Sequence, residues 1–237
     1  MAIYAIADLH LPFGINKPMD VFGKAWENYT DKLFTNWNNI VKAGDTVVIP
    51  GDLSWATYLE QSYNDFEFIN NLNGKKIISK GNHDYYYTTL SKMNKFFKDN
   101  NFSTIEILHN NYYMVENILI CGTRGWDISG NSEEDKKLLA REAIRLEISI
   151  TKALAAYPDL PVYAFLHYPP IYNHIKNKGT EIRGILEKYN VEKCFFGHLH
   201  ANGINYAFLG EYNSVVYSLI SADSLNFNPL PISEPNF

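Results

Sequence analysis

Five short motifs along the 237-residue chain hold side chains that could do chemistry. In order, they are Asp8-x-His10, Gly51-Asp52, Gly81-Asn82-His83-Asp84, His167 and Gly197-His198-x-His200. Each motif alone is a weak signal, because a Gly-Asp pair usually marks a turn and a single His is more often a satisfied core residue. Five of the seven histidines lie within these motifs. Together the motifs predict a metal site.

The donor types narrow the choice of metal. Imidazole together with carboxylate and amide oxygens suits divalent ions such as Mn, Fe or Zn, whereas Ca²⁺ favours an all-oxygen shell. The motifs contain no Cys, which argues against a structural zinc site. They offer more donors than one ion needs, so two ions that share a bridging carboxylate fit the count. His109 and His174 lie outside the motifs, and we interpret them as satisfied residues rather than ligands.

The motifs follow predicted β-strands. Short apolar runs predict strands at Ala2–Ala7, Thr46–Ile49, Lys76–Ser79, Val162–Leu166 and Lys193–Phe196. A motif comes directly after each of these runs. Ligands of α/β proteins collect outside the carboxyl ends of the strands, so we expect the five motifs to meet there.

Helices and hairpins make up the rest of the predicted fold. Helical patterns cover Pro18–Lys42, Leu59–Leu72, Thr89–Asp99, Ser132–Ala156 and Glu181–Lys188. Further strands are predicted at Tyr112–Val115, Ile118–Cys121, Ile204–Leu209 and Ser214–Leu219, the first two forming a hairpin around Glu116-Asn117. This pattern indicates an α/β (α+β) protein with a mixed sheet or a two-sheet sandwich flanked by helices. We predict a single domain over residues 1–237, with a C-terminal tail at 222–237 that straps the domain or meets a partner.

Composition excludes several classes of function. The chain is 46% hydrophobic and carries a formal net charge of −5, so it has no electrostatic reason to bind nucleic acid or an anionic membrane. It has no run of about 18 apolar residues and does not begin like a secretion signal. Cys121 and Cys194 stand apart in apolar runs, which suits buried free thiols in a reducing cytoplasm. We therefore expect a cytoplasmic protein; its oligomeric state is left open.

The five motifs together resemble those of the calcineurin-like metallophosphoesterase superfamily. They span residues 8 to 200 and so most of the chain. The resemblance implies a four-layer αββα sandwich with two mixed sheets. It also implies ligand assignments: Asp8, His10 and His200 would hold a first ion, Asn82, His167 and His198 a second, and Asp52 would bridge the two.

The resemblance further implies a reaction. Two ions would clamp the phosphate oxygens, and the hydroxide formed from a bound water would attack phosphorus. His83 would hold no metal and would face the substrate phosphate and the leaving oxygen. From the adjacency of the two residues we infer that Asp84 orients the His83 ring. Asn82 would also contact the substrate.

The sequence departs from the family after the second strand. Many members have GDxxD there and the protein phosphatases have GDxxDRG, but this chain continues from Asp52 as Leu53-Ser54-Trp55-Ala56. A phosphoprotein phosphatase is therefore doubtful, because the missing Arg normally helps to bind the phosphate of the phosphoprotein. Trp55 could stack on a flat substrate group or cover the core.

Two further places could shape a substrate pocket. The run Tyr85-Tyr86-Tyr87 follows the central motif and could contact a ring of the substrate or pack under its loop. Arg124 closes a strand and could grip a second phosphate or the scissile one, or instead pair with Asp127 or an acid on a helix.

The expected function is that of a dinuclear metal-dependent phosphoesterase. Its substrate would be a phosphomonoester or phosphodiester of a small molecule or nucleotide. The alternatives are a catalytically silent metal-binding scaffold on the same fold and a phosphoprotein phosphatase. All seven expected ligand positions are filled, which weakens the scaffold alternative.

Overall fold

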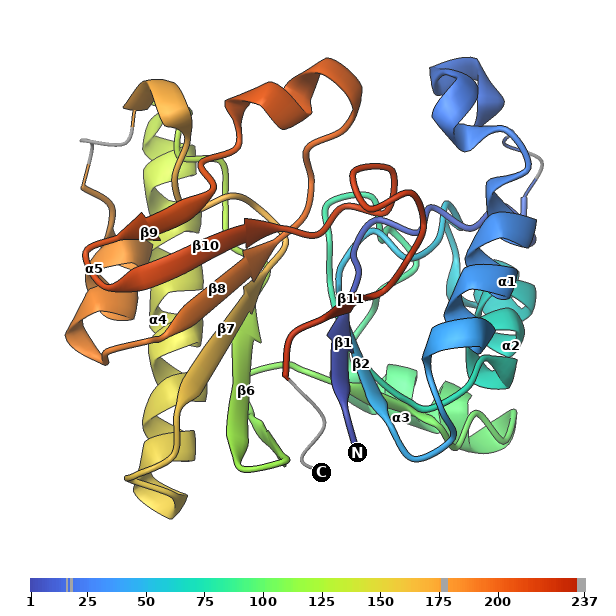
Figure 1. The fold of residues 1–237 in the computed structure, drawn as a ribbon, viewed down its shortest axis with the longest axis horizontal. Coiled ribbons are helices and arrows are strands. Elements are labelled where there is room, and N and C mark those ends of the chain that lie inside the picture. Colours follow the sequence, from blue (N-terminus) through green and yellow to red (C-terminus); the bar gives the residue numbers. More distant parts are fainter. Residues whose placement is uncertain (16, 18, 176–178, 234–237) are drawn as a thin grey trace.

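Two β-sheets pack face to face in the computed structural model, with helices on both outer sides (Figure 1). The structure describes residues 1–15, 17, 19–175 and 179–233. One sheet has five strands in the order β11-β1-β2-β3-β4, and the other has six in the order β5-β6-β7-β8-β10-β9. Both sheets are mixed, so the predicted α/β sandwich with two mixed sheets flanked by helices is confirmed.

The five-stranded sheet is parallel except at one edge. Its strands are β1 (Ile3–Ala5), β2 (Thr46–Pro50), β3 (Lys75–Ser79), β4 (Ile105–Ile107) and β11 (Leu230–Pro231). β11 pairs antiparallel with β1, and the other strands run parallel. Every residue of β1 and β2 is buried, because parallel strands are covered on both faces and therefore read as continuous apolar runs.

The six-stranded sheet has a parallel centre and antiparallel edges. Its strands are β5 (Tyr113–Val115), β6 (Ile118–Thr123), β7 (Val162–Leu166), β8 (Lys193–Phe196), β9 (Gly210–Tyr212) and β10 (Val215–Leu219). β5 and β6 form the predicted hairpin. β9 and β10 form a second hairpin at the opposite edge.

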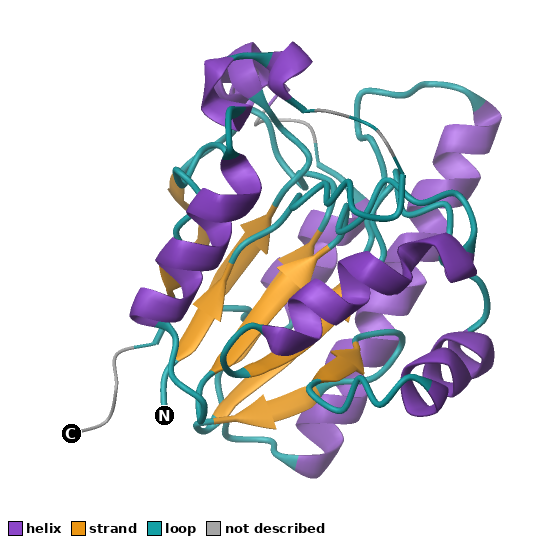
Figure 2. Ribbon diagram, turned by 90° about the vertical axis from the view of Figure 1, so that its right-hand side faces the viewer, coloured by secondary structure: helices purple, strands orange, loops and turns teal. Residues whose placement is uncertain are grey.

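Helices cover the outer face of each sheet (Figure 2). The first sheet carries α1 (Tyr29–Ile40), α2 (Tyr63–Asn71) and α3 (Leu90–Asp99), and the second carries α4 (Glu133–Ala156) and α5 (Glu181–Lys188). Short 3-10 turns lie at Asp20–Phe22, Lys24–Trp26, Leu59–Ser62, Asn173–Ile175 and Ala201–Tyr206. Within the described residues, no helix is both long and apolar enough to cross a membrane.

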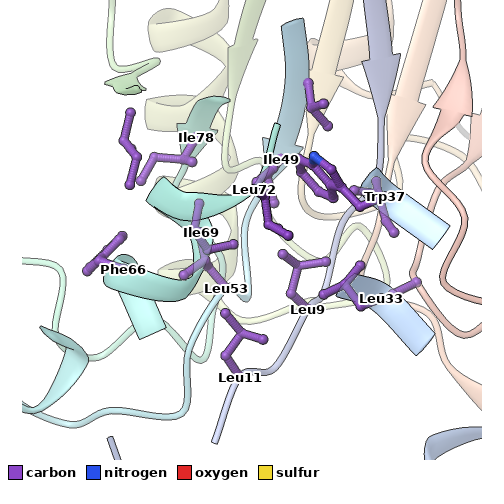
Figure 3. Packing of buried hydrophobic residues seen from close by; sticks show 14 of the residues in the cluster. Leu9, Leu11, Leu33, Trp37, Ile49, Leu53, Phe66, Ile69, Leu72 and Ile78 are labelled. Atoms are coloured by element: carbon purple, nitrogen blue, oxygen red, sulfur yellow. The ribbon is translucent and has the colours of Figure 1, made fainter. Parts of the chain in front are cut away.

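Three hydrophobic clusters fill the spaces between the four layers. In the first, Leu33 and Trp37 of α1 and Phe66 of α2 pack against the sheet residues Ile49 and Ile78 (Figure 3). A second cluster joins α4 and α5 to the six-stranded sheet. The third lies between the sheets and contains Ile3, Ala5, Val48, Ile120, Phe165, Phe195 and Ile220. The buried apolar area fixes the two sheets against each other and so places their strand ends side by side.

The helix predicted at Pro18–Lys42 is wrong in its first part. Pro18 lies outside the described residues, and the segment that follows forms two 3-10 turns before α1 begins at Tyr29. Gly23 has a φ of 120° and Asn28 a φ of 52°. Both conformations are incompatible with a right-handed helix, so Met19 and Trp26, which are buried, join the core from irregular segments rather than from one helix.

The strand predicted at Ile204–Leu209 is also wrong. That segment holds the 3-10 turn Ala201–Tyr206, and the strand begins only at Gly210. The strand begins later than predicted because it belongs to the β9–β10 hairpin. The turn residues of this hairpin, Asn213 and Ser214, have φ of 49° and 63°. This two-residue turn sets the register of the hairpin. The hydrophobic pattern of the sequence also did not predict strand β4.

The C-terminal tail packs onto the first sheet as far as residue 233. Ala222 and Phe227 belong to the cluster under α1, and β11 runs antiparallel to β1. Residues 234–237 lie outside the described residues. Of the two alternatives for the tail, the described part straps the domain.

Candidate metal centre

The carboxyl ends of strands from both sheets meet at one edge of the sandwich. Ala7, just beyond β1, donates its backbone N–H to Ile220 O at 2.7 Å, and Ala222 donates back to Ala7 O at 2.9 Å. These bonds join the end of β1 to the segment after β10. All five motifs lie at this junction, as the strand pattern predicts.

Four of the seven predicted ligands have left-handed backbone conformations. The φ angles of Asp8, His10, Asp52 and His198 are 61°, 47°, 50° and 74°. Such values are uncommon for residues other than glycine and cost free energy, so the surrounding structure must hold them. Here each strand turns sharply at its end, which directs the side chain into the junction rather than along the sheet.

Asp8, His10 and His200 form one cluster of donors. One candidate ligand atom from each lies within 4.8 Å of the others. His10 Nε2 lies 3.3 Å from His200 Nε2 and 3.8 Å from Asp52 Oδ2. Asp8 and His10 are buried, so their donor atoms face one another away from solvent.

Asn82, His167 and His198 form a second cluster. Asn82 Oδ1 lies 2.6 Å from His167 Nε2 and 2.8 Å from His198 Nδ1, and the two ring nitrogens are 3.3 Å apart. Asp52 Oδ2 lies 3.6 Å from His167 Nε2. The same carboxylate oxygen thus contacts both clusters.

The two clusters fit divalent metal ions. Donors about 2.0–2.2 Å from a common ion are separated by about 3–3.5 Å, which matches the His–His separations of 3.3 Å in each cluster. Asp8 Oδ1 is buried and has no hydrogen-bond partner among the described residues. An unpaired buried carboxylate oxygen is costly, and a cation would satisfy it.

The protonation equilibria also suit a cation. Burial, and then neighbouring histidines, hold the pKa of His10 and of His167 well below the usual value, and burial lowers the pKa of His198 to about 4. Burial raises the pKa of Asp8 to about 6 and that of Asp52 well above its usual value. Without an ion the buried carboxylates therefore resist ionisation. A divalent cation reverses this, since it favours neutral imidazole and ionised carboxylate.

His83 lies beside the clusters, held by its backbone. Its N–H donates to Asp52 Oδ1 at 2.7 Å, and its ring centroid lies 5.8 Å from that of His10 and 4.7 Å from that of Trp55. Burial, then Lys17 and His200, lower the pKa of His83. This position, next to the ligands yet half-buried, is open to a bound substrate.

Asp84 does not orient His83 as inferred from the sequence. Its buried carboxylate accepts backbone N–H groups from Gly81 at 2.7 Å, from Asp52 at 2.9 Å and from Leu53 at 2.9 Å. No hydrogen bond to the His83 ring occurs among the described contacts. Because N–H groups of two loops converge on it, the carboxylate fixes the Asp52 loop against the Gly81 loop. Asp84 is therefore a positioning residue for the loop that carries Asp52.

The three tyrosines of the predicted pocket differ in their exposure to solvent. Tyr85 is 63% exposed and its ring centroid lies 6.2 Å from that of His83, so it remains a candidate substrate contact. Tyr86 and Tyr87 are buried. Trp55 is buried and stacks on the His10 ring at 4.5 Å, so it packs against a candidate ligand.

Arg124 lies on the edge of the site nearest β7. Its backbone carbonyl accepts the N–H of His167 at 3.1 Å. Its guanidinium lies 4.7 Å from the Trp126 ring centroid and 3.9 Å from Glu142, an acid on helix α4. The ion pair with a helix acid was one of the alternatives from the sequence, and a role toward substrate stays a prediction.

Asp223 was missed by the sequence analysis. It lies just beyond β10 in the tail, and its Oδ1 is 2.9 Å from His200 Nδ1. A carboxylate on the second ring nitrogen orients a metal-binding histidine. No spacing rule connects the tail to the last histidine motif, so only the fold could reveal this pair.

A four-layer sandwich whose strand ends gather carboxylate, amide and imidazole donors defines a metallophosphoesterase. The family model of the calcineurin-like phosphoesterases matches residues 1–202, and the chain belongs to that family. No curated protein matches the chain.

Solved structures share the fold at low sequence identity. A protein of unknown function from Aquifex aeolicus, AQ665, is 16% identical with a TM-score of 0.53, covering 97% of this chain and 95% of that one. TT1561 of Thermus thermophilus is 15% identical with a TM-score of 0.55, covering 90% and 89%. The phosphopantetheinyl hydrolase PptH from Mycobacterium tuberculosis is 12% identical with a TM-score of 0.53, covering 100% and 97%. At such identities the likeness is one of fold alone.

Proposed function

We propose that this protein is a dinuclear metal-dependent phosphoesterase acting on a phosphomonoester or phosphodiester of a small molecule or nucleotide. The supporting observation is the position of Asp52, whose Oδ2 lies 3.8 Å from His10 Nε2 and 3.6 Å from His167 Nε2. One ion would be held by Asp8, His10 and His200, the other by Asn82, His167 and His198, with Asp52 between them. Divalent ions such as Mn, Fe or Zn supply Lewis acidity toward phosphate oxygens and acidify a water.

His83 is the proposed acid of the reaction. Its backbone bond to Asp52 keeps the ring beside the clusters without using a ring nitrogen. The imidazole is thus free to contact the phosphate or to give a proton to the leaving oxygen. The pKa of His83 is lowered by burial and nearby cations, and the negative charge of a bound phosphate would raise it again.

A small apolar pocket next to His83 supports an organic ester as substrate. Its volume is about 170 Å³, and it is lined by His10, Met19, Phe22, Trp26, Trp55, His83, His200 and Ala201. Aromatic and aliphatic walls suit a carbon skeleton rather than an ionic group. The absence of the GDxxDRG motif also favours a small molecule over a phosphoprotein.

The test is metal-dependent turnover. Protein stripped of metal is loaded with Mn²⁺, Zn²⁺ or Fe²⁺ and assayed on p-nitrophenyl phosphate and bis-p-nitrophenyl phosphate, with metal content measured in parallel. Turnover that requires added metal supports the proposal, and the ratio of the two rates separates monoesterase from diesterase. Two tightly bound ions without turnover on these esters or on a panel of phosphorylated metabolites would instead indicate a scaffold.

A further inference from the structure

A second, strongly basic pocket lies between the ends of β3, β4 and β6 and helix α4. Its volume is about 280 Å³, and its lining comprises Ser79, Lys80, Tyr87, Thr88, Leu108, His109, Asn110, Gly122, Thr123, Arg124, Arg141, Glu142 and Arg145. Four of these side chains are cations and one is a carboxylate. The metal centre uses none of them as ligands.

One buried carboxylate organises the cations. Glu142 is fully buried and accepts the Thr123 hydroxyl at 2.6 Å. Arg145 approaches it at 2.8 Å and Arg141 at 3.2 Å, with Arg124 at 3.9 Å. A single carboxylate cannot neutralise three guanidinium groups and Lys80, so the pocket keeps three excess positive charges.

The cations are partly removed from water, which makes this excess costly. The Arg124 side chain is only 17% exposed, and its Nε is buried with no hydrogen-bond partner among the described residues. Burial, and then Arg145, lower the pKa of His109, so this ring can donate a hydrogen bond without adding charge. Guanidinium groups arranged around a cavity bind phosphate through paired N–H donors.

The basic pocket adjoins the second donor cluster through the backbone. The Arg124 carbonyl accepts the N–H of His167 at 3.1 Å. On the other side, Lys80 is separated from Asn82 by one glycine. Tyr87, on the same loop, has Lys80 Nζ 5.5 Å from its ring centroid. The backbone segments that carry Arg124 and Lys80 therefore lie next to residues of the second donor cluster.

We propose that the basic pocket binds a second phosphate of the substrate, so that the preferred substrates carry one phosphate besides the ester that is cleaved. The inference rests on the proposed function and narrows its substrate class to bisphosphorylated small molecules or nucleotides. The metal centre takes the ester that is cleaved, and the basic pocket takes the uncleaved phosphate.

Matched substrate pairs test this directly on the metal-loaded enzyme. Hexose 6-phosphate is compared with hexose 1,6-bisphosphate, and nucleoside 5′-monophosphate with nucleoside 3′,5′-bisphosphate. We expect kcat/KM to favour the bisphosphate at least tenfold in one pair. Arg141→Gln and Arg145→Gln should each reduce that preference at least tenfold, while Lys136→Gln, an exposed cation on the same helix paired with Glu133, should leave it unchanged. No preference in any pair, or a preference that survives both arginine variants, overturns the inference.

A measurement of phosphate binding distinguishes a failure of this inference from a failure of the proposed function. Calorimetry of the metal-loaded protein with inorganic phosphate should give two binding events per chain, and one in Arg141→Gln. Arg141 is suited to this test because its side chain is 47% exposed, so its replacement leaves Arg145 on Glu142 and the fold intact. If no ester is turned over but two phosphates bind and Arg141→Gln loses one, the proposed function fails and the pocket stands. A single event in both proteins removes the pocket.

Discussion

His200 Nδ1 lies 2.9 Å from Asp223 Oδ1, so a carboxylate from the tail determines which ring nitrogen of His200 faces the donor cluster. The other nitrogen, Nε2, faces His10 Nε2 at 3.3 Å. Asp223 Oδ2 also accepts the backbone N–H of Ala201 at 3.1 Å, which fixes the carboxylate. Burial lowers the pKa of His200, but the hydrogen bond to Asp223 together with the charges of Asp8 and Asp223 raises it, and the net shift is upward.

Replacing Asp223 should weaken one metal site. The Asp223→Ala variant leaves the His200 ring free to rotate, and loss of such a partner typically costs about 10–100-fold in metal affinity. Titration of the stripped protein with Zn²⁺ or Mn²⁺ should show one weakened site and one of unchanged affinity. Asp99→Ala, an exposed acid paired with Lys95, is the control. Two unchanged sites in Asp223→Ala would remove Asp223 from the metal centre.

Replacing Asp84 should destabilise the protein even without metal. Asp84→Asn keeps the shape but turns an amide N–H₂ toward backbone N–H groups that now donate to a carboxylate. Because a buried charged hydrogen bond is worth about 1.5–3 kcal/mol and several are disturbed, we expect the free energy of unfolding to fall by about 2–4 kcal/mol. Urea unfolding in the presence of a chelator measures this, with Asp99→Asn as control. A variant as stable as the parent would contradict the positioning role.

Replacing His83 should separate catalysis from metal binding. His83→Ala is expected to retain both ions, since no ring nitrogen of His83 contacts the clusters in the described structure, while kcat on p-nitrophenyl phosphate falls by about 10²–10⁴-fold. Elemental analysis and steady-state kinetics give the two readouts. His174→Ala, which removes an exposed histidine, should match the parent in both. Loss of metal in His83→Ala would show that this residue is a ligand.

Asp65 should make stability depend on pH. Burial raises its pKa to about 6, and its carboxylate accepts the Ser54 hydroxyl and the Phe13 N–H. The folded state thus holds this proton more tightly than the unfolded chain, whose Asp pKa is about 3.9. The stabilisation is complete below about pH 4 and is lost as pH rises through 6, by about 3 kcal/mol at most.

The measurement is a difference between two proteins. The free energy of unfolding of the parent minus that of Asp65→Asn, both in chelator, should fall between pH 4 and pH 7. Taking the difference cancels the contributions of Asp8 and Asp52, whose pKa values are also raised by burial. A difference that stays constant over this range would mean that Asp65 is ionised normally in the folded protein.

Local patterns were enough to predict most elements and the strand-end motifs that meet in the fold. Apolar runs predicted the strands that hold the motifs because parallel strands are buried on both faces. The helical pattern at Ser132–Ala156 predicted α4, and in the structure Ser132 and Asp135 cap its first turn. The helix before Tyr29 failed because an amphipathic pattern does not report the left-handed conformations of Gly23 and Asn28.

By itself the sequence determined the donor chemistry, because the type of each side chain and its place after a strand are local properties. The tertiary structure decided which side chains meet across the two sheets. Asp223 reaches His200 only because the tail folds back under α1, and Asp84 supports Asp52 rather than His83 because two loops converge on its carboxylate. Likewise Arg124 joins Arg141 and Arg145 around Glu142 only through the packing of α4 on β6. Such contacts depend on how the packed layers are aligned with one another. The spacing of residues along the sequence does not report that alignment.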